Sequence, residues 1–431
     1  MSSDRSRHDI QVIVRAAIAA VSPRVLVPRA LEISAVRQFV IGRPVHLLAV
    51  GKAAAPMASA WLQNGLRPDH GLVVGTIRGG AALDSLSWRE GGHPIPDERS
   101  VAAAQEAMML SRSVASNACL VVLLSGGASA LMALPVSDLT ISDKQTAVSA
   151  LLKAGADITA LNTVRKHLSR VKGGRLAAAC PGSTLTLAIS DVVGDDPAVI
   201  GSGPTVADRT TFADARRAIE RLDVATRLPK SVMSVIEAGA RGEVEESVKP
   251  GDPRLRRSEW HMIGGRRHAM AGAKEAAAAL GYKTIVIEEP VIGEARETAR
   301  GHVRQLQALR HSMEGPLCII SSGETTVKVT GDGMGGRNQE FVLAAAGALS
   351  DLPPGSTIAS VGTDGIDGPT NAAGAVADSW TLSRASAAGL SDPATYLSHN
   401  DAYRFFERLG DLIFTAPTDT NVGDVQVALI P

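Results

Sequence analysis

The apolar positions of this chain alternate between strand-like and helix-like patterns along its whole length. Runs of strand length are continuously apolar, and segments with apolar residues every three or four positions separate them. In the first half these runs are residues 45–50, 72–76, 118–124 and 185–190. Continuous apolar strands are typical of parallel sheets with helices on both faces, so the pattern predicts an α/β fold.

A second series of the same kind begins at Trp260. We expect strands at 260–263, 283–288, 316–321, 325–330, 356–361 and 425–430, and helices at 266–280, 293–312 and 337–349. The charged segment 241–257, with its proline and glycines, is interpreted as a linker. Because 431 residues exceed one ordinary core, we predict two α/β domains, 1–245 and 258–431, with the last strands free to cross back.

The amino-acid composition argues against nucleic acid and membranes as binding partners. The chain has 44 basic and 44 acidic residues and only 3% aromatic residues, so neither a basic face nor base-stacking platforms for nucleic acid are expected. Its three cysteines, Cys119, Cys180 and Cys318, lack metal-binding spacing, which favours reduced thiols in the cytoplasm. No signal-peptide core and no apolar run of membrane-spanning length is present, so we expect no membrane partner.

A glycine-rich loop, residues 331–336, precedes the predicted helix at 337. Free N–H groups at a helix start favour an anion, and Arg337 adds a cation suited to carboxylate or phosphate. We therefore predict that Gly335, Arg337, Asn338 and Gln339 hold an acidic small molecule. The loop also contains G-x-G-x-x-G, so a dinucleotide site and a plain tight turn remain alternatives.

Polar residues also follow two strands of the first series. Lys52 comes directly after the strand 45–50, where open α/β sheets bind ligands. Ser125, Gly126, Gly127 and Ser129 lie between the strand 118–124 and a helix, which is typical of a phosphate cradle. A surface lysine and a hydrolase-type serine nucleophile are the alternatives, but the G-x-S-x-G pattern of such nucleophiles is absent.

Further candidates for ligand contact lie in loops and on one helix. Glu90 and His93 belong to a rigid loop with glycines and prolines, where His93 could equally stabilise the turn. Asn162, Arg165 and Lys166 place amide and cationic groups on a predicted helix without acidic partners nearby in sequence. That arrangement favours contact with an anion, although a solvated helix face remains an alternative.

Acidic residues end two strands. Asp191, Asp195 and Asp196 follow the strand 185–190, and Asp364 follows the strand 356–361. Carboxylate oxygens suit Mg²⁺, which proteins commonly bind through one or two carboxylates plus substrate phosphates. We therefore predict that at least one of Asp191, Asp195 and Asp196 holds Mg²⁺ or takes a hydroxyl proton, and that Asp364 contacts the substrate or nucleotide. Helix capping by Asp195 or Asp196 is the alternative.

Taken together, these motifs resemble the MOFRL-type glycerate 2-kinases from residue 8 to residue 428. The matching segments are V-G-K-A-A from Val50, E-G-G-H-P-I-P-D from Glu90, L-S-G-G-A-S-A-L from Leu124, L-N-T-V-R-K-H-L-S from Leu161, K-G-G-R-L from Lys172, S-D-V-V-G-D-D from Ser190, G-S-G-P-T from Gly201, G-E-T-T-V from Gly323, G-G-R-N-Q-E from Gly335, G-T-D-G-I-D-G-P-T from Gly362 and T-N-V-G-D from Thr420. One departure is M-I-G-G-R-R from Met262, where that family often has an asparagine-containing turn.

The resemblance implies ATP-dependent phosphorylation of D-glycerate at its 2-hydroxyl. It also implies a large Rossmann-like N-terminal domain and a smaller C-terminal one with the site in the cleft between them. Lys52, Asp191 and Arg337 are its implied catalytic residues, and Asp191 and Asp196 become the candidate Mg²⁺ ligands. The other classes are an NAD(P)H-dependent hydroxypyruvate reductase and a non-catalytic metabolite-binding protein. Glycerate and ATP are the expected partners, and a homodimer is left open.

Overall fold

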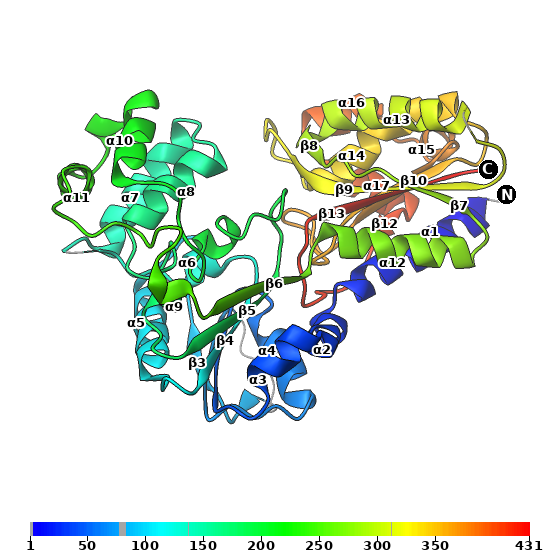
Figure 1. Ribbon diagram of the computed structural model, residues 1–431. Coiled ribbons are helices and arrows are strands. Elements are labelled where there is room, and N and C mark those ends of the chain that lie inside the picture. The colour runs from blue at the N-terminus through cyan, green and yellow to red at the C-terminus, as the bar shows by residue number, and fades with distance from the viewer. Residues whose placement is uncertain (1–2, 77–82, 137, 312) are drawn as a thin grey trace. The chain divides into compact units, whose positions relative to one another are not determined.

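The chain folds into two compact units in the computed structural model, which describes residues 3–76, 83–136, 138–311 and 313–431 (Figure 1). The central unit is Leu26–Ile263, and the terminal unit combines Met1–Val25 with Gly264–Pro431. Both units contain a sheet and helices, so the predicted α/β fold with two domains is confirmed. The contacts divide the chain differently from the predicted boundaries, because the first 25 residues join the C-terminal part.

The central unit is built on a six-stranded sheet in the order β3-β2-β1-β4-β5-β6. Its strands are β1 (Val45–Val50), β2 (His70–Gly75), β3 (Ser87–Glu90), β4 (Cys119–Leu124), β5 (Ser183–Ile189) and β6 (Ser258–Gly264). The pairs from β3 to β5 are parallel. β1, β4 and β5 are buried along their whole length, as expected for apolar strands covered on both faces.

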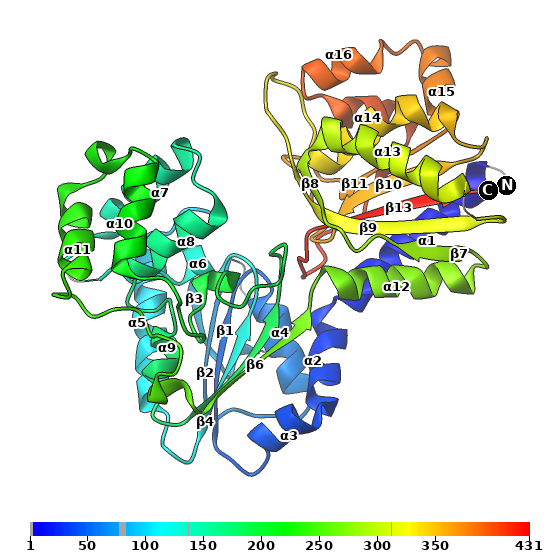
Figure 2. The ribbon, with the colours of Figure 1, turned by 45° about the horizontal axis from the view of Figure 1, so that its top comes forward.

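Helices cover this sheet and also form a cluster of their own. They are α2 (Pro23–Glu32), α3 (Ser34–Val40), α4 (Ala54–Gln63), α5 (Glu98–Ser113), α6 (Ala128–Leu131), α7 (Ile141–Lys153), α8 (Ile158–His167), α9 (Arg175–Ala178), α10 (Phe212–Arg221) and α11 (Lys230–Ala240), with 3-10 turns η2 (Ile200–Ser202), η3 (Ala225–Arg227) and η4 (Pro253–Leu255). α7, α8, α10 and α11 gather around a separate apolar core that includes Leu151, Val164 and Phe212 (Figure 2). The central unit therefore presents a helical face beside its sheet.

The sheet of the terminal unit is mixed, with the order β12-β11-β10-β13-β9-β7 and with β8 paired to β9. Its strands are β7 (Lys283–Val286), β8 (Val291–Glu294), β9 (Leu317–Thr326), β10 (Thr357–Gly362), β11 (Gly374–Asp378), β12 (Leu412–Ile413) and β13 (Asp424–Ile430). β13, the last strand in sequence, lies antiparallel between β10 and β9. The centre of this sheet therefore depends on the final residues of the chain.

The helices of the terminal unit include the first helix of the chain. They are α1 (Ser3–Ala20), α12 (Arg266–Ala279), α13 (Ala295–His311), α14 (Arg337–Ala346), the 3-10 turn η5 (Gly347–Asp351), α15 (Thr381–Ala387), α16 (Pro393–Ser398) and α17 (Ala402–Leu409). α1 packs against α12 and β13 and buries Ile10 and Ile13 completely. Its Arg7 guanidinium pairs with the buried carboxylates of Asp378 and Asp411. These contacts explain why the N-terminal helix belongs to this unit.

Three local expectations differ from the structure. The strand expected to open the second series is β6, the edge of the central sheet. The expected linker 241–257 packs within the central unit, where Val248 N donates to Gly173 O at 3.0 Å and Thr184 N donates to Arg257 O at 2.9 Å. The expected strand 325–330 is largely wrong, because β9 runs on to Thr326 and residues 327–330 are not in a strand.

Within the described ranges no single helix is long and apolar enough to cross a bilayer, and the pair Asp4–Ala20 and Pro23–Glu32 reaches the necessary length only across a break at which it bends. Several apolar residues of α1, among them Ile10, Ile13 and Val14, are buried in the terminal unit. The predicted helix end at Ser312 lies outside the described residues.

Candidate functional site

Five of the predicted residues come together where the strands of the central sheet end. A Cβ added to Gly126 would lie 1.9 Å from Asp191 Oδ2. A Cβ added to Gly127, which has φ +82°, would lie 3.2 Å from Lys52 Cγ and 3.1 Å from His93 Cδ2. Parallel strands place their carboxyl ends at one edge, and β1, β4 and β5 are in register there. We call Lys52, His93, Gly126, Gly127 and Asp191 the strand-end cluster.

Ser125 holds the loop that precedes this cluster. Its side chain is buried, and its Oγ accepts the N–H of Ala53 at 3.1 Å. Lys52 N donates to Gly126 O at 2.8 Å, so the loops after β1 and β4 are bonded to each other. Gly51 has φ +130°, and a Cβ there would lie 2.1 Å from Ser125 Oγ. The predicted ligand residue Ser125 thus positions Lys52, and its hydroxyl points into the protein.

His93 and Glu90 take different places, although Glu90 ends β3 and His93 lies in the loop directly after it. His93 borders Gly127, and partial desolvation together with the neighbouring Lys52 ammonium lowers the pKa of its imidazole. The ring therefore favours its neutral form, which can accept a proton or a hydrogen bond. Glu90 instead forms an exposed ion pair with Arg99, with Oε1 at 2.6 Å from Nη1.

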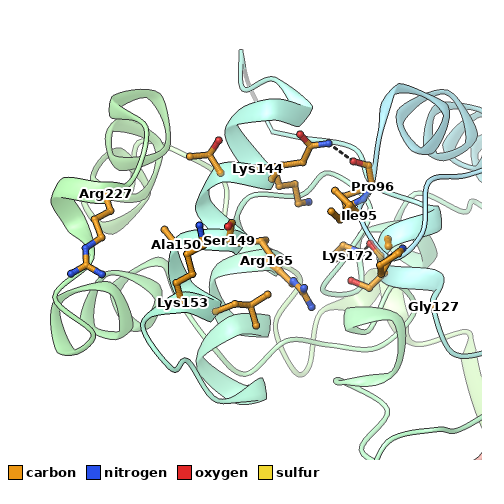
Figure 3. A pocket seen from close by; sticks show the side chains of 17 residues that line it. Ile95, Pro96, Gly127, Lys144, Ser149, Ala150, Lys153, Arg165, Lys172 and Arg227 are labelled. Carbon is orange, nitrogen blue, oxygen red and sulfur yellow. Dashed lines mark hydrogen bonds between the residues drawn. The ribbon is translucent and has the colours of Figure 1, made fainter. Parts of the chain in front are cut away.

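A cavity of about 1080 Å³ opens beside the cluster, between α7, α8 and the loops after β3 and β4 (Figure 3). Gly127 and Ser129 lie on its wall, so the cavity adjoins the strand-end cluster. Its lining includes five cationic side chains, Lys144, Lys153, Arg165, Lys172 and Arg227, and no acidic residue among the described ones. We call this space the cationic pocket. Its charge suits an anionic ligand.

Two of these cations are buried lysines. Lys172 Nζ donates to the backbone carbonyls of Ser129 at 2.7 Å and Met132 at 3.4 Å, and Lys144 Nζ donates to Leu168 O at 3.3 Å. Burial lowers the pKa of Lys144 to about 7, with Arg165 contributing, and lowers the pKa of Lys172 well below its ordinary value. The hydrogen bonds described for these two ammonium groups are therefore to backbone carbonyl oxygens and not to carboxylates.

Sequence reasoning did not select Lys144, and Lys172 appeared there only at the start of the family-like segment K-G-G-R-L. A signal for Lys144 was present, because it shares an apolar face of α7 with Ile141, Ala147 and Leu151. A lysine in an apolar pattern has two explanations: the helix boundaries or face were predicted incorrectly and the lysine is exposed, or the lysine is buried. Only the packing of α7 distinguishes these explanations.

Asn162 and Lys166 lie on α8 and line a second cavity of about 540 Å³. Asn162 Oδ1 accepts the Ser202 hydroxyl at 2.9 Å, and Ser202 Oγ is 2.9 Å from Ser129 Oγ. This chain of bonds connects α8 to the loop after β4. Lys166 is buried and pairs with the Asp208 carboxylate at 3.1 Å. This partner is 42 residues away in sequence, so the absence of nearby acidic residues did not reveal it, and contact of Lys166 with an anion stays a prediction.

The acidic residues after β5 divide between two roles. Asp191 contacts Gly126 in the strand-end cluster. Asp196 Oδ1 accepts the N–H of Ala198 at 2.8 Å in its own turn, and Asp196 lines the second cavity. It does not cap the helical turn η2, whose N-cap is Val199. Within the described ranges no three His, Cys, Asp or Glu side chains gather as a metal-binding group. A carboxylate such as Asp191 with substrate phosphates is still a donor set that fits Mg²⁺.

In the terminal unit, the start of α14 is already occupied by a protein carboxylate. Asp367 accepts the N–H of Asn338 at 3.0 Å and the N–H of Gln339 at 2.8 Å. A Cβ at Gly336 would lie 2.3 Å from Asp367 Oδ1, so the glycine allows this approach. The expectation that these N–H groups are free for a ligand is wrong. Burial raises the pKa of Asp367 to about 7, opposed by these hydrogen bonds.

Arg337 is held by two carboxylates. Its Nε and Nη2 donate to the buried Asp424 at 2.7 and 3.0 Å, and its Nη1 donates to Glu324 at 2.8 Å. Burial alone would lower the pKa of the guanidinium, but the charge of Asp424 raises it above its ordinary value. Asn338 Nδ2 also donates to Asp424, at 3.0 Å. Arg337 is therefore a fixed, permanently charged group at the end of β13.

The glycine loop itself is shaped by the segment before α17. Gly333 N donates to His399 O at 2.8 Å, and the N–H of Gly331 donates to Asn400 Oδ1 at 2.9 Å. A Cβ at Gly331 would lie 2.4 Å from His399 Cα, and a Cβ at Gly335 would lie 3.2 Å from Ala402 N. These glycines serve close packing of two backbones. That arrangement does not support the dinucleotide interpretation. Asp364 accepts the N–H of Ile366 at 3.2 Å in its own loop.

Comparison with known proteins supports a family assignment. The domain of unknown function DUF4147 matches residues 9–237, and the MOFRL family matches residues 317–424. The glycerate 2-kinase of Pyrococcus horikoshii is 38% identical over 398 residues, which are 91% of this chain and 89% of that protein. This chain belongs to the MOFRL-type glycerate 2-kinase family.

Other members of the family agree in sequence and structure. A D-glycerate 2-kinase of Thermotoga maritima is 38% identical over 90% of each chain. The crystal structure of a glycerate kinase from T. maritima matches with a TM-score of 0.88 at 36% identity and covers 99% of this chain and 100% of its own. One relative in Agrobacterium vitis, 38% identical over 99% of this chain and 94% of its own, carries a provisional hydroxypyruvate reductase name.

Proposed function

We propose that this protein transfers a phosphoryl group from ATP to the 2-hydroxyl of D-glycerate and forms 2-phosphoglycerate. The observation that carries this proposal is the strand-end cluster, in which a lysine, a histidine and an aspartate surround two glycines at the end of a parallel sheet. Phosphoryl transfer needs cations for the transferred group and a carboxylate for the metal or the hydroxyl proton. Family membership supplies the substrate, because relatives at 38% identity are named glycerate 2-kinases.

We assign roles within the cluster from chemistry. Lys52 neutralises charge on the transferred phosphoryl group, and the glycines at 126 and 127 let the phosphates approach the backbone. Asp191 either takes the proton of the 2-hydroxyl or holds Mg²⁺. His93, which favours its neutral form, is able to accept a hydrogen bond from the substrate. Ser125 fixes the loop that carries Lys52.

Arg337 is the third proposed catalytic residue. Its bidentate pair with Asp424 leaves the guanidinium charged and fixed in direction. We infer that it contributes to binding of the glycerate carboxylate or of the transferred phosphoryl group by exchanging its bond with the more exposed Glu324. Asp364, Gly335, Asn338 and Gln339 remain proposed neighbours of that ligand, although the N–H groups of the last two already bind Asp367.

Mg²⁺ fits the donor set at Asp191, whose carboxylate lies against Gly126 where only a glycine allows the approach. When bound there, the ion would neutralise phosphate charge and orient the phosphates. Asp196 is proposed as a further ligand only by resemblance, since its Oδ1 is bonded to a backbone N–H. The three cysteines are buried free thiols, which supports our proposal of a reducing, cytoplasmic setting.

The experiment is an assay of the purified protein with D-glycerate, ATP and Mg²⁺, in which ADP release is coupled to NADH oxidation. Adding enolase without a phosphoglycerate mutase identifies the product, because only phosphorylation at the 2-hydroxyl yields an enolase substrate. A parallel reaction contains hydroxypyruvate with NADH or NADPH. We expect ADP release that requires glycerate and stops in excess chelator. Nicotinamide oxidation by hydroxypyruvate without glycerate-dependent ADP release would contradict the proposal.

A further inference from the structure

The cationic pocket gathers basic side chains without any acidic side chain in its described lining. Lys144 and Lys172 are 3% and 1% exposed, and their ammonium groups donate only to backbone carbonyls in the bonds described above. Arg165 projects toward the same space from α8 (Figure 3). Placing a charged group in such an environment without a counter-ion is costly, so this arrangement is expected where a ligand brings the negative charge.

The other walls of the pocket are apolar. Ile95, Val148, Ala150 and Leu152 contribute to the lining, together with prolines of the loop after β3. In Figure 3 Lys144, Arg165 and Lys172 lie toward Gly127, whereas Lys153 and Arg227 lie at the other side. A volume of about 1080 Å³ is far more than a three-carbon acid needs. Size, charge and apolar walls together fit an amphipathic polyanion.

We propose that Lys144, Arg165 and Lys172 bind the polyphosphate of the nucleotide donor, and that the apolar walls of the cationic pocket hold its base. This assignment rests on the proposed kinase function and adds the location of the donor. Gly127 and Ser129 belong both to the wall of the pocket and to the loop of the strand-end cluster. A polyphosphate bound there would extend toward Lys52, where the transferred group is needed.

Binding of a polyphosphate in the cationic pocket should change the protonation of Lys144. Besides burial, the neighbouring basic groups lower the pKa values of both lysines. Arg165 of α8 and Arg175 of α9 lower the pKa of Lys144, and Lys144 and Arg165 lower the pKa of Lys172. With its pKa lowered to about 7, Lys144 is largely neutral at pH 8 in the free protein. A polyphosphate stabilises the charged form, so binding at pH 8 takes up a proton, and binding below pH 6 takes up less.

Calorimetric titration of the full-length protein with inorganic tripolyphosphate tests this without any turnover. The variants are Lys144→Met and Lys172→Met, which keep the length of the side chain, and the control is Lys230→Met, an exposed lysine on α11. We expect each pocket variant to weaken tripolyphosphate binding at least about tenfold, the scale of one lost hydrogen bond to a charged group. Replacing a buried lysine by Met should not lower the melting temperature, which separates loss of binding from loss of folding.

Two further measurements test the protonation of Lys144 and distinguish a polyphosphate ligand from a three-carbon phosphate ligand. Titrations at pH 8 in two buffers of different ionisation enthalpy measure proton uptake, which Lys144→Met should reduce and Lys230→Met should retain. Titration with 2-phosphoglycerate tests whether the pocket serves the three-carbon substrate instead. Unchanged tripolyphosphate affinity in both variants, or loss of 2-phosphoglycerate binding alone, would overturn the proposal. If the protein showed no glycerate kinase activity but the variants still lost tripolyphosphate binding, the pocket assignment would stand and only the proposed function would fail.

Discussion

Replacing Gly126 by alanine tests the strand-end cluster most directly. The added Cβ would lie 1.9 Å from Asp191 Oδ2 and 2.5 Å from its Cγ. Ordinary contacts of a Cβ begin near 3.4 Å, so the loop and the carboxylate must separate by about 1.5 Å (3.4 minus 1.9). Gly126 does not have a positive φ, so the effect comes from this contact and not from backbone strain.

The size of the effect follows from two known scales. Overpacking a well-packed site costs about 1–3 kcal/mol, which lowers the melting temperature of a unit this large by roughly 2–4 °C per kcal/mol. Displacing a reacting group by about 1 Å costs on the order of 10²-fold in rate. We therefore expect Gly126→Ala to lower kcat for glycerate phosphorylation about a hundredfold while the protein remains folded.

The measurements are steady-state kinetics with glycerate and ATP, together with thermal unfolding. Gly347→Ala is the matched control, because Gly347 has helical φ and ψ and no atom lies within 4 Å of the added Cβ. In a double-mutant cycle, Asp191→Ala should restore part of the stability that Gly126→Ala loses, because it removes the clashing carboxylate. Wild-type kcat and melting temperature in Gly126→Ala would refute the described geometry of the cluster.

Three further outcomes are expected. Arg7→Ala should destabilise the protein by about 3 kcal/mol, because it leaves two buried carboxylates short of a partner. Replacing the exposed Arg5 of the same helix by alanine should change the urea midpoint little. Equal urea midpoints for the two variants would contradict this. Lys52→Ala and Arg337→Ala should each lower kcat by roughly 10³-fold. Only Arg337→Ala should also lower the melting temperature, because it leaves the buried Asp424 unpaired. A melting temperature equal to wild type in Arg337→Ala would show that the buried pair is not formed. Because burial raises the pKa of Asp367 to about 7, the folded state binds more protons than the unfolded state between pH 4 and 7, so the free energy of unfolding should fall as pH rises through that window. Urea titrations of Asp367→Asn should show a weaker fall, and an unchanged slope would exclude this group as its source.

Sequence patterns gave the elements of the central unit because its strands are continuously apolar and its loops carry local signals. The strands β1, β4 and β5 were expected within two residues of their observed bounds. Lys52 and the glycines after β4 follow those strands directly, so their common edge could be predicted from parallel order alone. Asp191 was expected at that edge for the same reason.

The remaining features depend on contacts between distant segments. Nothing near Arg337 in sequence indicates that Asp424 will bind it, and nothing near Gly336 indicates that Asp367 will occupy the start of α14. The pairing of Lys166 with Asp208 also spans 42 residues. In each case a polar or charged group was interpreted as a ligand contact, and a carboxylate from a distant segment was its partner. Local patterns contain no information on such partners.

The order in which this chain leaves the ribosome matters because of where β13 lies. Residues of the central unit are contiguous and can fold as soon as they have emerged. The terminal unit has to wait for β13, which is made after β9 and β10 and lies between them in the sheet. Until then the apolar side of α1 and one edge of the fully buried β10 lack the contacts that β13 provides and are available to chaperones or to aggregation. A premature stop before β13 would therefore leave a translated chain whose terminal unit has no sheet centre.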